Sequence, residues 1–443
     1  MIRQNFNADW TVEKGDGNSR MNSFLGNTQT KTVHLPYDAM IHEARTPDTK
    51  NGAQTGFYPG GEYIFQKHFT APQAWQGKPV SLVFEGVYQT ALVYLNGWLL
   101  TRNVNGYAEF TVEAGPYLKY GADNLLKVIA DNSLEPNSRW YTGSGIYRPV
   151  RLLVGNKVYL PQDTVRITTR EADERFALLD VTAQVQSAST VTERVTLQQT
   201  ICRKGTAVLT DRQNLLLQPG ESRTVSFRYC VDSPALWSPE NPNLYTSTMQ
   251  VLEGEEELDR EETGFGIRTL SIDAAHGVRI NGQTVKLRGA CIHHDNGILG
   301  AATLPDAEER RIRQLKEAGF NAIRSSHHSA GRALLDACDR YGVLVMDELS
   351  DVWNVRKNPY DYALYFEQDW KPTIQKMVAK DYNHSSVILY CVGNEISEAG
   401  SESGAETNRR LCNTFRELDP TRYTTNALNG LMAAGYRLRE IMG

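Results

Sequence analysis

Apolar and polar residues alternate with a period of two through much of the first 160 residues, the pattern of half-buried β-strands. In EYIFQKHF (62–69), Tyr63, Phe65 and Phe69 fall on one side of such a strand. TALVYL (90–95) alternates in the same way and is followed by Asn-Gly, the strongest short signal for a hairpin. Half-buried strands must cover their apolar faces with a second sheet, so residues 1–160 are predicted to form a β-sandwich.

A second stretch of strands is predicted over residues 161–272. Val225, Phe227, Tyr229 and Val231 alternate with polar residues, and turn residues recur about every ten positions. This spacing is typical of a small immunoglobulin-like sandwich.

From residue 273 onward, short apolar runs alternate with segments whose apolar residues recur every three or four positions. The predicted strands are RGACIHH (288–294), AIRSSHH (322–328), VLVMDEL (343–349), VILYCVGNE (387–395) and YTTNAL (423–428). Between them, Leu334, Cys338 and Tyr341 share one helical face, and Gly342 is placed to end that helix. Repeated βα units with nearly continuous apolar strands predict a buried parallel sheet.

Two parallel architectures fit this pattern, the open doubly wound sheet and the closed (β/α)8 barrel. No G-x-G-x-x-G turn follows the first strand, which counts against nucleotide binding. Polar residues cluster instead at the C-terminal ends of the strands, where a barrel enzyme builds its active site. We therefore predict a TIM barrel over 273–443. That segment holds only about five βα units, so the barrel is expected to be incomplete.

Composition narrows the class of protein. A formal net charge of −5 over 443 residues gives no reason to expect nucleic acid or an anionic membrane as a partner. No apolar run is long enough to span a membrane, and the first residues lack a basic stretch followed by an apolar one, so a cytoplasmic protein is expected. The six cysteines are scattered without a C-x-x-C pair, which favours reduced thiols over disulfides.

Three long segments carry a resemblance to a known family. They are PNSRWYTGSGIYRPV (136–150), NAIRSSHHSAGRALLDACDRYGVLVMDE (321–348) and DYNHSSVILYCVGNE (381–395). In this order they are similar to signatures of glycoside hydrolase family 2, which contains β-galactosidases, β-glucuronidases and β-mannosidases. The resemblance covers essentially the whole chain. It implies a multidomain β plus α/β protein with a jelly-roll sugar-binding domain, an immunoglobulin-like domain and a TIM barrel.

The resemblance also implies roles for individual residues. Glu395, which closes an apolar strand, is expected to be the acid/base of a retaining mechanism, and Asn394 to bind the 2-hydroxyl of the sugar. Sugar contacts are implied for His327 and for the region of His293. The nucleophile of the family is a glutamate on a later strand, and we expect it to be absent from this chain.

Other polar residues near the strand ends allow more than one interpretation. Asp347 could accept hydrogen bonds from sugar hydroxyls or pair with Arg324, and Trp353 could stack on a pyranose ring. In well-known relatives the segment at Arg139 carries an aspartate. Either this change alters which sugar hydroxyls the first domain touches, or Arg139 is a plain salt-bridge residue.

The histidine pairs 293–294 and 327–328 could hold zinc, contact sugar or pack the barrel rim. Adjacent strand residues point to opposite faces, so at most one histidine of each pair faces the barrel interior. No cofactor is expected to be required, although some family members bind magnesium beside the acid/base and the sequence leaves magnesium undecided.

The leading hypothesis is a retaining exo-β-glycosidase of the β-galactosidase kind whose isolated chain is inactive. β-Glucuronidase and β-mannosidase are the alternatives in the same chemistry. A carbohydrate-binding protein without turnover and a metal-dependent barrel hydrolase are the alternatives from other classes. The expected partners are a small carbohydrate and either a second copy or a complementing C-terminal fragment, because an incomplete barrel leaves strand edges open.

Overall fold

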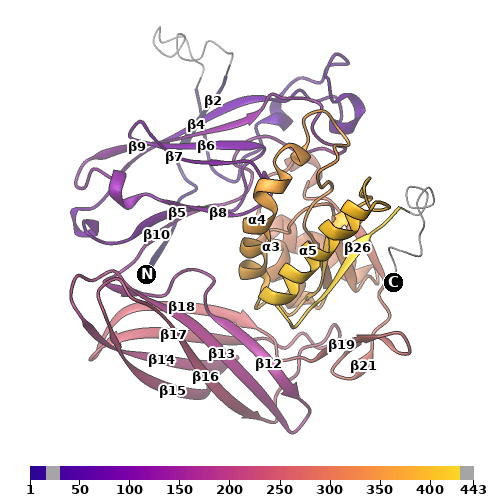
Figure 1. Ribbon diagram of the computed structural model, residues 1–443. Helices are drawn as coiled ribbons and strands as arrows, with labels where there is room; N and C mark the ends of the chain where they lie inside the picture. Colours follow the sequence, from indigo (N-terminus) through magenta and orange to yellow (C-terminus); the bar gives the residue numbers. More distant parts are fainter. Residues whose placement is uncertain (16–29, 430–443) are drawn as a thin grey trace.

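The computed structural model describes residues 1–15 and 30–429, which form two β-sandwiches and a parallel α/β unit (Figure 1). The first sandwich is antiparallel throughout, with one sheet in the order β3-β2-β4-β9-β6-β7 and the other in the order β1-β10-β5-β8. Its strands are β1 Ile2–Asn5, β2 Trp10–Lys14, β3 Lys31–Val33, β4 Gly61–Thr70, β5 Val80–Phe84, β6 Thr90–Leu95, β7 Trp98–Asn103, β8 Phe110–Glu113, β9 Asp123–Asn132 and β10 Val150–Val154.

The sequence pattern of this sandwich explains its two layers. In β9, Leu126, Val128 and Ala130 are fully buried while the residues between them are only partly so. The predicted hairpin joins β6 to β7, and both turn residues have positive φ, 52° at Asn96 and 90° at Gly97. Asn and Gly tolerate that left-handed conformation, which makes the tight two-residue turn accessible.

The second sandwich has long antiparallel strands, lower in Figure 1. Strand β13 pairs with β11, β12 and β16, and the facing sheet has the order β15-β14-β17-β18. The strands are β11 Val158–Tyr159, β12 Arg166–Ala172, β13 Phe176–Ser187, β14 Glu193–Arg203, β15 Thr206–Leu217, β16 Ser222–Asp232, β17 Tyr245–Glu253 and β18 Glu256–Phe265. The alternating apolar residues of β16 point into the shared core, as the sequence pattern predicts.

The α/β unit contains the five predicted strands, all parallel and paired in chain order. They are β22 Gly289–Ile292, β23 Ala322–Ser325, β24 Leu344–Glu348, β25 Val387–Asn394 and β26 Tyr423–Ala427. The helices are α2 Pro305–Glu317, α3 Arg332–Tyr341, α4 Phe366–Asp381 and α5 Glu402–Leu418. A small antiparallel sheet precedes them, made of β19 Leu270–Asp273, β20 Gly277–Ile280 and β21 Gln283–Thr284.

Strand order distinguishes the two parallel architectures. Pairing in strict sequence order is the arrangement of a (β/α)8 barrel, whereas a doubly wound sheet reverses direction at a switch point. Residues 1–15 and 30–429 therefore contain four βα units of a TIM barrel and the strand of a fifth. Figure 1 shows α3, α4 and α5 together on one side of the sheet, and the core between helices and sheet includes Trp370, Tyr390 and Phe415.

The opposite, concave face of this sheet is not covered by the described residues. An apolar hollow of about 210 Å³ lies over it, lined in part by Leu287, Ala290, Ile323 and Leu389. Within residues 1–15 and 30–429, the outer strands β22 and β26 each pair with a single neighbour. None of the helices in this described part is long and apolar enough to cross a membrane.

The C-terminal ends of the barrel strands face loops of the first sandwich. Arg148 of that sandwich donates from Nη2 to the carbonyl oxygen of Ser329 (3.1 Å), and His294 Nε2 lies 2.9 Å from the carbonyl oxygen of Thr142. Arg332 at the start of α3 donates to both carboxylate oxygens of Glu109, each at 2.8 Å. These contacts fix the sandwich loops over the mouth of the barrel.

Candidate active site

Glu395 is the first residue after β25, and its backbone is held in an unusual conformation. Its φ is +44°, in the left-handed region that residues with a Cβ rarely adopt. Its backbone N–H donates to the carbonyl oxygen of Ala427 at 2.7 Å, which ties the end of β25 to β26. Local strain of this kind is concentrated at functional sites, where the surrounding structure enforces it.

The side chain of Glu395 lies at the barrel mouth and is 41% exposed. Its Oε1 accepts a hydrogen bond from Asn429 Nδ2 (3.3 Å), and its Oε2 accepts one from Arg139 Nη1 (3.4 Å). Both contacts are long for hydrogen bonds, so the carboxyl group remains accessible to an incoming polar ligand.

The neighbouring Asn394 has an amide whose orientation is fixed from both sides. Its Oδ1 accepts from Arg324 Nη2 (2.9 Å), and its Nδ2 donates to Asp351 Oδ1 (2.7 Å). Because arginine can only donate and an ionised carboxylate can only accept, the amide cannot be flipped without losing both bonds. One N–H and one lone pair remain for a ligand.

Asp351 is the most connected residue of the site. It accepts from Arg139 through both oxygens, with Nη2–Oδ1 at 2.7 Å and Nε–Oδ2 at 3.1 Å, and from Lys357 Nζ at 2.9 Å. Burial alone would raise the pKa of Asp351, but the hydrogen bonds from Arg139 and the charge of Lys357 lower it. Asp351 is therefore a carboxylate held by three side chains, with three hydrogen bonds to Oδ1 and one to Oδ2.

A second carboxylate, Glu348, lies at the end of β24 with a fully buried side chain. It forms an ion pair with Arg324 Nε, and its Oε1 lies 2.8 Å from His327 Nδ1. The ring of His327 makes edge contacts with His293 and Trp140, with centroid distances of 5.4 and 5.5 Å. His327, His293 and Trp140 thus form an aromatic wall beside Arg324 and Asp351, the residues that hold Asn394.

The two histidine pairs follow the ends of β22 and β23, and the two members of each pair point in different directions. His293 and His327 contact each other, whereas His294 and His328 point into the interface with the first sandwich, where His328 stacks on Tyr107 at 3.8 Å. Burial lowers the pKa of His294 to about 3 and also lowers the pKa of His328. These two imidazoles are therefore neutral packing groups of the interface.

Two predicted site residues are corrected by the structure. Asp347 has no exposed surface, and its Oδ1 accepts the backbone N–H of Ala330 (2.8 Å) on the helical side of the sheet. Trp353 is also fully buried, with its indole N–H donating to the carbonyl oxygen of Val392 (2.9 Å). Neither side chain reaches the barrel mouth, so the predicted sugar contacts of Asp347 and Trp353 are wrong.

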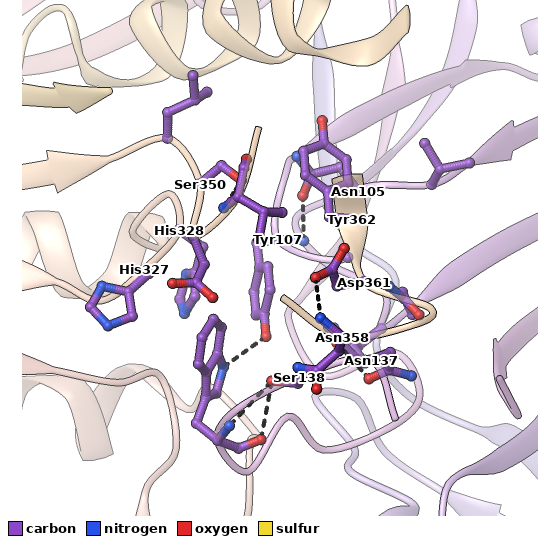
Figure 2. A pocket seen from close by; sticks show the side chains of 18 residues that line it. Asn105, Tyr107, Asn137, Ser138, His327, His328, Ser350, Asn358, Asp361 and Tyr362 are labelled. Atoms are coloured by element: carbon purple, nitrogen blue, oxygen red, sulfur yellow. Dashed lines mark hydrogen bonds between the residues drawn. The ribbon is translucent and has the colours of Figure 1, made fainter. Parts of the chain in front are cut away.

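A cavity of about 50 Å³ lies next to these residues, between the first sandwich and the barrel (Figure 2). In Figure 2, His327 and His328 lie on one side of it, and Asn358 and Asp361 on the other. Asp351 belongs to its lining, whereas Glu395 and Asn394 do not. The cavity is therefore a neighbour of the acid/base candidate rather than its immediate surroundings.

The donor set does not fit a metal ion. The described residues contain no group of three or more His, Cys, Asp or Glu side chains placed to hold one. Two carboxylates of this site are paired with cations, Asp351 with Arg139 and Lys357, and Glu348 with Arg324. A divalent ion needs carboxylate oxygens that are free to coordinate it, so no step is assigned to magnesium or zinc.

Sequence comparison matches three models of one family along residues 10–435. They are "Glycosyl hydrolase 2 galactose-binding domain-like" over 10–178, "Glycosyl hydrolases family 2" over 158–268, and "Glycosyl hydrolases family 2, TIM barrel domain" over 274–435. The matches follow the order of the three structural units.

Individual relatives give the same result. The chain is 36% identical to a β-galactosidase of Bacteroides ovatus, covering 91% of this chain and 48% of that protein, and 27% identical to a β-glucuronidase of Bacteroides fragilis, covering 90% and 58%. A family 2 glycosyl hydrolase structure from Bacteroides cellulosilyticus superposes with a TM-score of 0.93 at 36% identity, covering 97% of this chain and 56% of that one. The chain thus spans about half the length of the curated relatives it matches.

Proposed function

The chain belongs to glycoside hydrolase family 2, and we propose that it is the acid/base-bearing part of a retaining exo-β-glycosidase of the β-galactosidase kind. The observation that carries this proposal is the placement of Glu395 at the barrel mouth, directly after Asn394, whose amide is oriented by Arg324 and Asp351. Active sites of TIM-barrel enzymes are built at this face of the sheet.

In the proposed reaction, Glu395 acts twice. It first donates a proton to the glycosidic oxygen as the bond to the anomeric carbon breaks, and it then takes a proton from the water that releases the sugar. The free N–H of Asn394 would donate to the 2-hydroxyl, a contact that strengthens as the ring approaches the transition state. His327, His293 and Arg324 line the same mouth, where they would contact hydroxyl groups.

A retaining mechanism also needs a nucleophile about 5–5.5 Å from the acid/base. Asp351 does not suit this role, because Arg139, Lys357 and Asn394 hold its carboxylate in place and two of them are cations that reduce its nucleophilicity. Glu348 does not suit it either, because its side chain is fully buried. We therefore propose that the nucleophile comes from outside the described residues and that the isolated chain does not turn over substrate.

The proposed macromolecular partner follows from the same argument. The apolar hollow over the concave face and the single-sided pairing of β22 and β26 fit a segment that supplies further βα units, either a complementing C-terminal fragment or a second copy. A location in the cytoplasm remains a prediction from the sequence.

The nearest alternative is a β-glucuronidase, which the similarity to the B. fragilis protein favours. A β-mannosidase and a carbohydrate-binding protein without turnover are the remaining alternatives. Calorimetric titration with methyl β-galactoside, methyl β-glucuronide and methyl β-mannoside distinguishes the sugars, and the galactoside is expected to bind most tightly. Tightest binding of the glucuronide would replace the galactosidase proposal, and binding of none would remove the sugar site altogether.

A turnover assay tests the role of Glu395. The purified chain is expected to release no nitrophenol from 4-nitrophenyl β-galactoside, and Glu395→Gln is the matched variant. Turnover that persists in Glu395→Gln would overturn the acid/base assignment. Turnover that is lost in Glu395→Gln would support that assignment and overturn the proposal that the nucleophile lies elsewhere.

A further inference from the structure

We propose that Asp351 is a positioning residue that couples the first sandwich to the acid/base site, an inference that rests on the function proposed above. Asp351 follows β24, yet its carboxylate bonds to groups from three separate parts of the fold. Arg139 comes from a loop of the first sandwich, Asn394 from the end of β25, and Lys357 from the loop that leads to α4.

The first consequence concerns Asn394. Its Nδ2 has two N–H groups, and Asp351 holds one of them at 2.7 Å. The other is thereby aimed at a fixed point, because rotation of the amide would also break the bond from Arg324 (2.9 Å). A donor that is fixed before the ligand arrives loses little conformational freedom on binding. Asp351 therefore sets how well the site recognises the 2-hydroxyl of a sugar.

The second consequence concerns Glu395. Arg139 is 212 residues away from Asp351 in sequence and 256 from Glu395, and its guanidinium contacts both. Nε and Nη2 are held by the two oxygens of Asp351, which leaves Nη1 directed at Glu395 Oε2 (3.4 Å). A planar guanidinium held at two points has its third nitrogen placed by geometry. The first sandwich thus contributes a residue that orients the acid/base candidate.

The backbone of the same loop is also held in place. Lys357 Nζ donates to the carbonyl oxygens of Asp351 and Asn394, both at 2.7 Å, in addition to the Asp351 carboxylate. Its side chain is only 9% exposed. Glu398 holds the loop from the other side by accepting the backbone N–H groups of Asn354 (2.8 Å) and Val355 (3.1 Å), without contact to Asn394 or Arg139.

The test measures binding of methyl β-galactoside and its 2-deoxy analogue to the full chain by calorimetry. The wild type is expected to prefer the parent sugar by about tenfold or more, because the analogue leaves the N–H of Asn394 without a partner. In Asp351→Asn the preference is expected to fall to about twofold, since one amide oxygen cannot serve the donors that the carboxylate serves.

Arg139→Gln gives the second measurement and changes a side chain that is 33% accessible. Asn394 stays fixed in this variant, so the preference for the parent sugar is expected to remain. Both sugars contact Glu395, which Arg139 no longer orients in this variant. Both are therefore expected to bind about fivefold more weakly to the variant than to the wild type. Glu398→Gln is the matched control, with both affinities as in the wild type.

Each result separates the two proposals. If Asp351→Asn retains the tenfold preference, or if Arg139→Gln leaves both affinities unchanged, the positioning role is wrong while the proposed function stands. If Glu398→Gln loses the preference as well, disorder of the loop explains the effect and the positioning role is again wrong. If the wild type binds neither sugar, the proposed function fails, and the positioning role fails with it.

Discussion

The left-handed backbone at Glu395 predicts that a glycine at this position stabilises the end of β25 relative to an alanine. At φ +44° the Cβ of any L-residue lies close to the following carbonyl oxygen, which costs roughly 1–2 kcal/mol. Glycine has no Cβ and avoids this strain. Its greater conformational freedom in the unfolded chain, however, costs roughly 0.5–1 kcal/mol on folding and offsets part of that stabilisation. Glu395→Gly is therefore expected to be about 0.5–1 kcal/mol more stable than Glu395→Ala.

Amide hydrogen exchange over Val387–Asn394 is the suitable assay, because it reports the free energy of local opening in this strand. A difference of about 0.5–1 kcal/mol corresponds to exchange roughly two- to fivefold slower in the glycine variant. The control pair is Ser397→Gly and Ser397→Ala, since Ser397 is not among the residues with positive φ. There the alanine variant should exchange more slowly.

An equal or faster exchange in Glu395→Gly than in Glu395→Ala would refute the argument from strain. The same order at Ser397 as at Glu395 would refute it too, because the effect would then be unrelated to φ. The expected result would mean that a residue with a Cβ at this position makes the fold less stable than glycine would. Such a cost is common where function requires a particular side chain.

Three further predictions concern stability. Arg422→Met is expected to lose about 3–5 kcal/mol in urea unfolding, because it leaves the buried carboxylate of Asp419 without its cation; a loss below about 1 kcal/mol would contradict this. Burial lowers the pKa of His294 to about 3. At pH values below 6.5, the ordinary pKa of histidine, this imidazole takes up a proton only when the protein unfolds. Stability is therefore expected to fall as the pH falls below 6.5, by up to about 1.4 kcal/mol per pH unit. Urea unfolding at pH 5, 6 and 7 should show a shallower loss in His294→Asn, and an unchanged slope would count against a neutral buried imidazole. Burial alone would lower the pKa of His384, but the adjacent Asp339 carboxylate raises it above 6.5, so its contribution is complete below pH 6.5 and disappears as pH rises through the raised pKa. His384→Gln should therefore lose more stability at pH 6 than at pH 9, and equal losses would exclude a charged pair.

The sequence pattern was sufficient for the five strands of the parallel sheet and for the place of Glu395 after the fourth of them, whereas the small sheet of β19, β20 and β21 was not predicted. Strand β25 is a run of buried apolar residues that ends in Asn394, so the position of the next residue at the barrel mouth follows from the parallel architecture alone. The hairpin at Asn96-Gly97 is equally local, because its signal is the φ tolerance of two adjacent residues.

The direction of side chains in β24 was not predictable in the same way. Leu344, Val345 and Met346 are consecutive apolar residues in β24, so no polar–apolar alternation shows which of the following residues points inward. The structure turns Glu348 toward Arg324 at the mouth and Asp347 toward the helices. Trp353 was misplaced for a related reason, since a loop aromatic carries no periodicity that distinguishes a stacking platform from a buried core residue.

The contacts of Asp351 could not be read from the chain either. Its main partner, Arg139, lies in another domain, and the sequence indicated only that the segment at Arg139 departs from the family pattern. Lys357 had no sequence signal, because a lysine in a polar loop is ordinarily a solvated surface residue. Only the packing of the first sandwich against the barrel brings these groups together.

A crystal structure of the chain with bound methyl β-galactoside tests the central claim most directly. The glycosidic oxygen is predicted to lie about 3 Å from a carboxylate oxygen of Glu395, with the 2-hydroxyl about 3 Å from Nδ2 of Asn394. A sugar bound only in the cavity beside Asp361, with Glu395 in contact with none of its oxygens, would contradict the account.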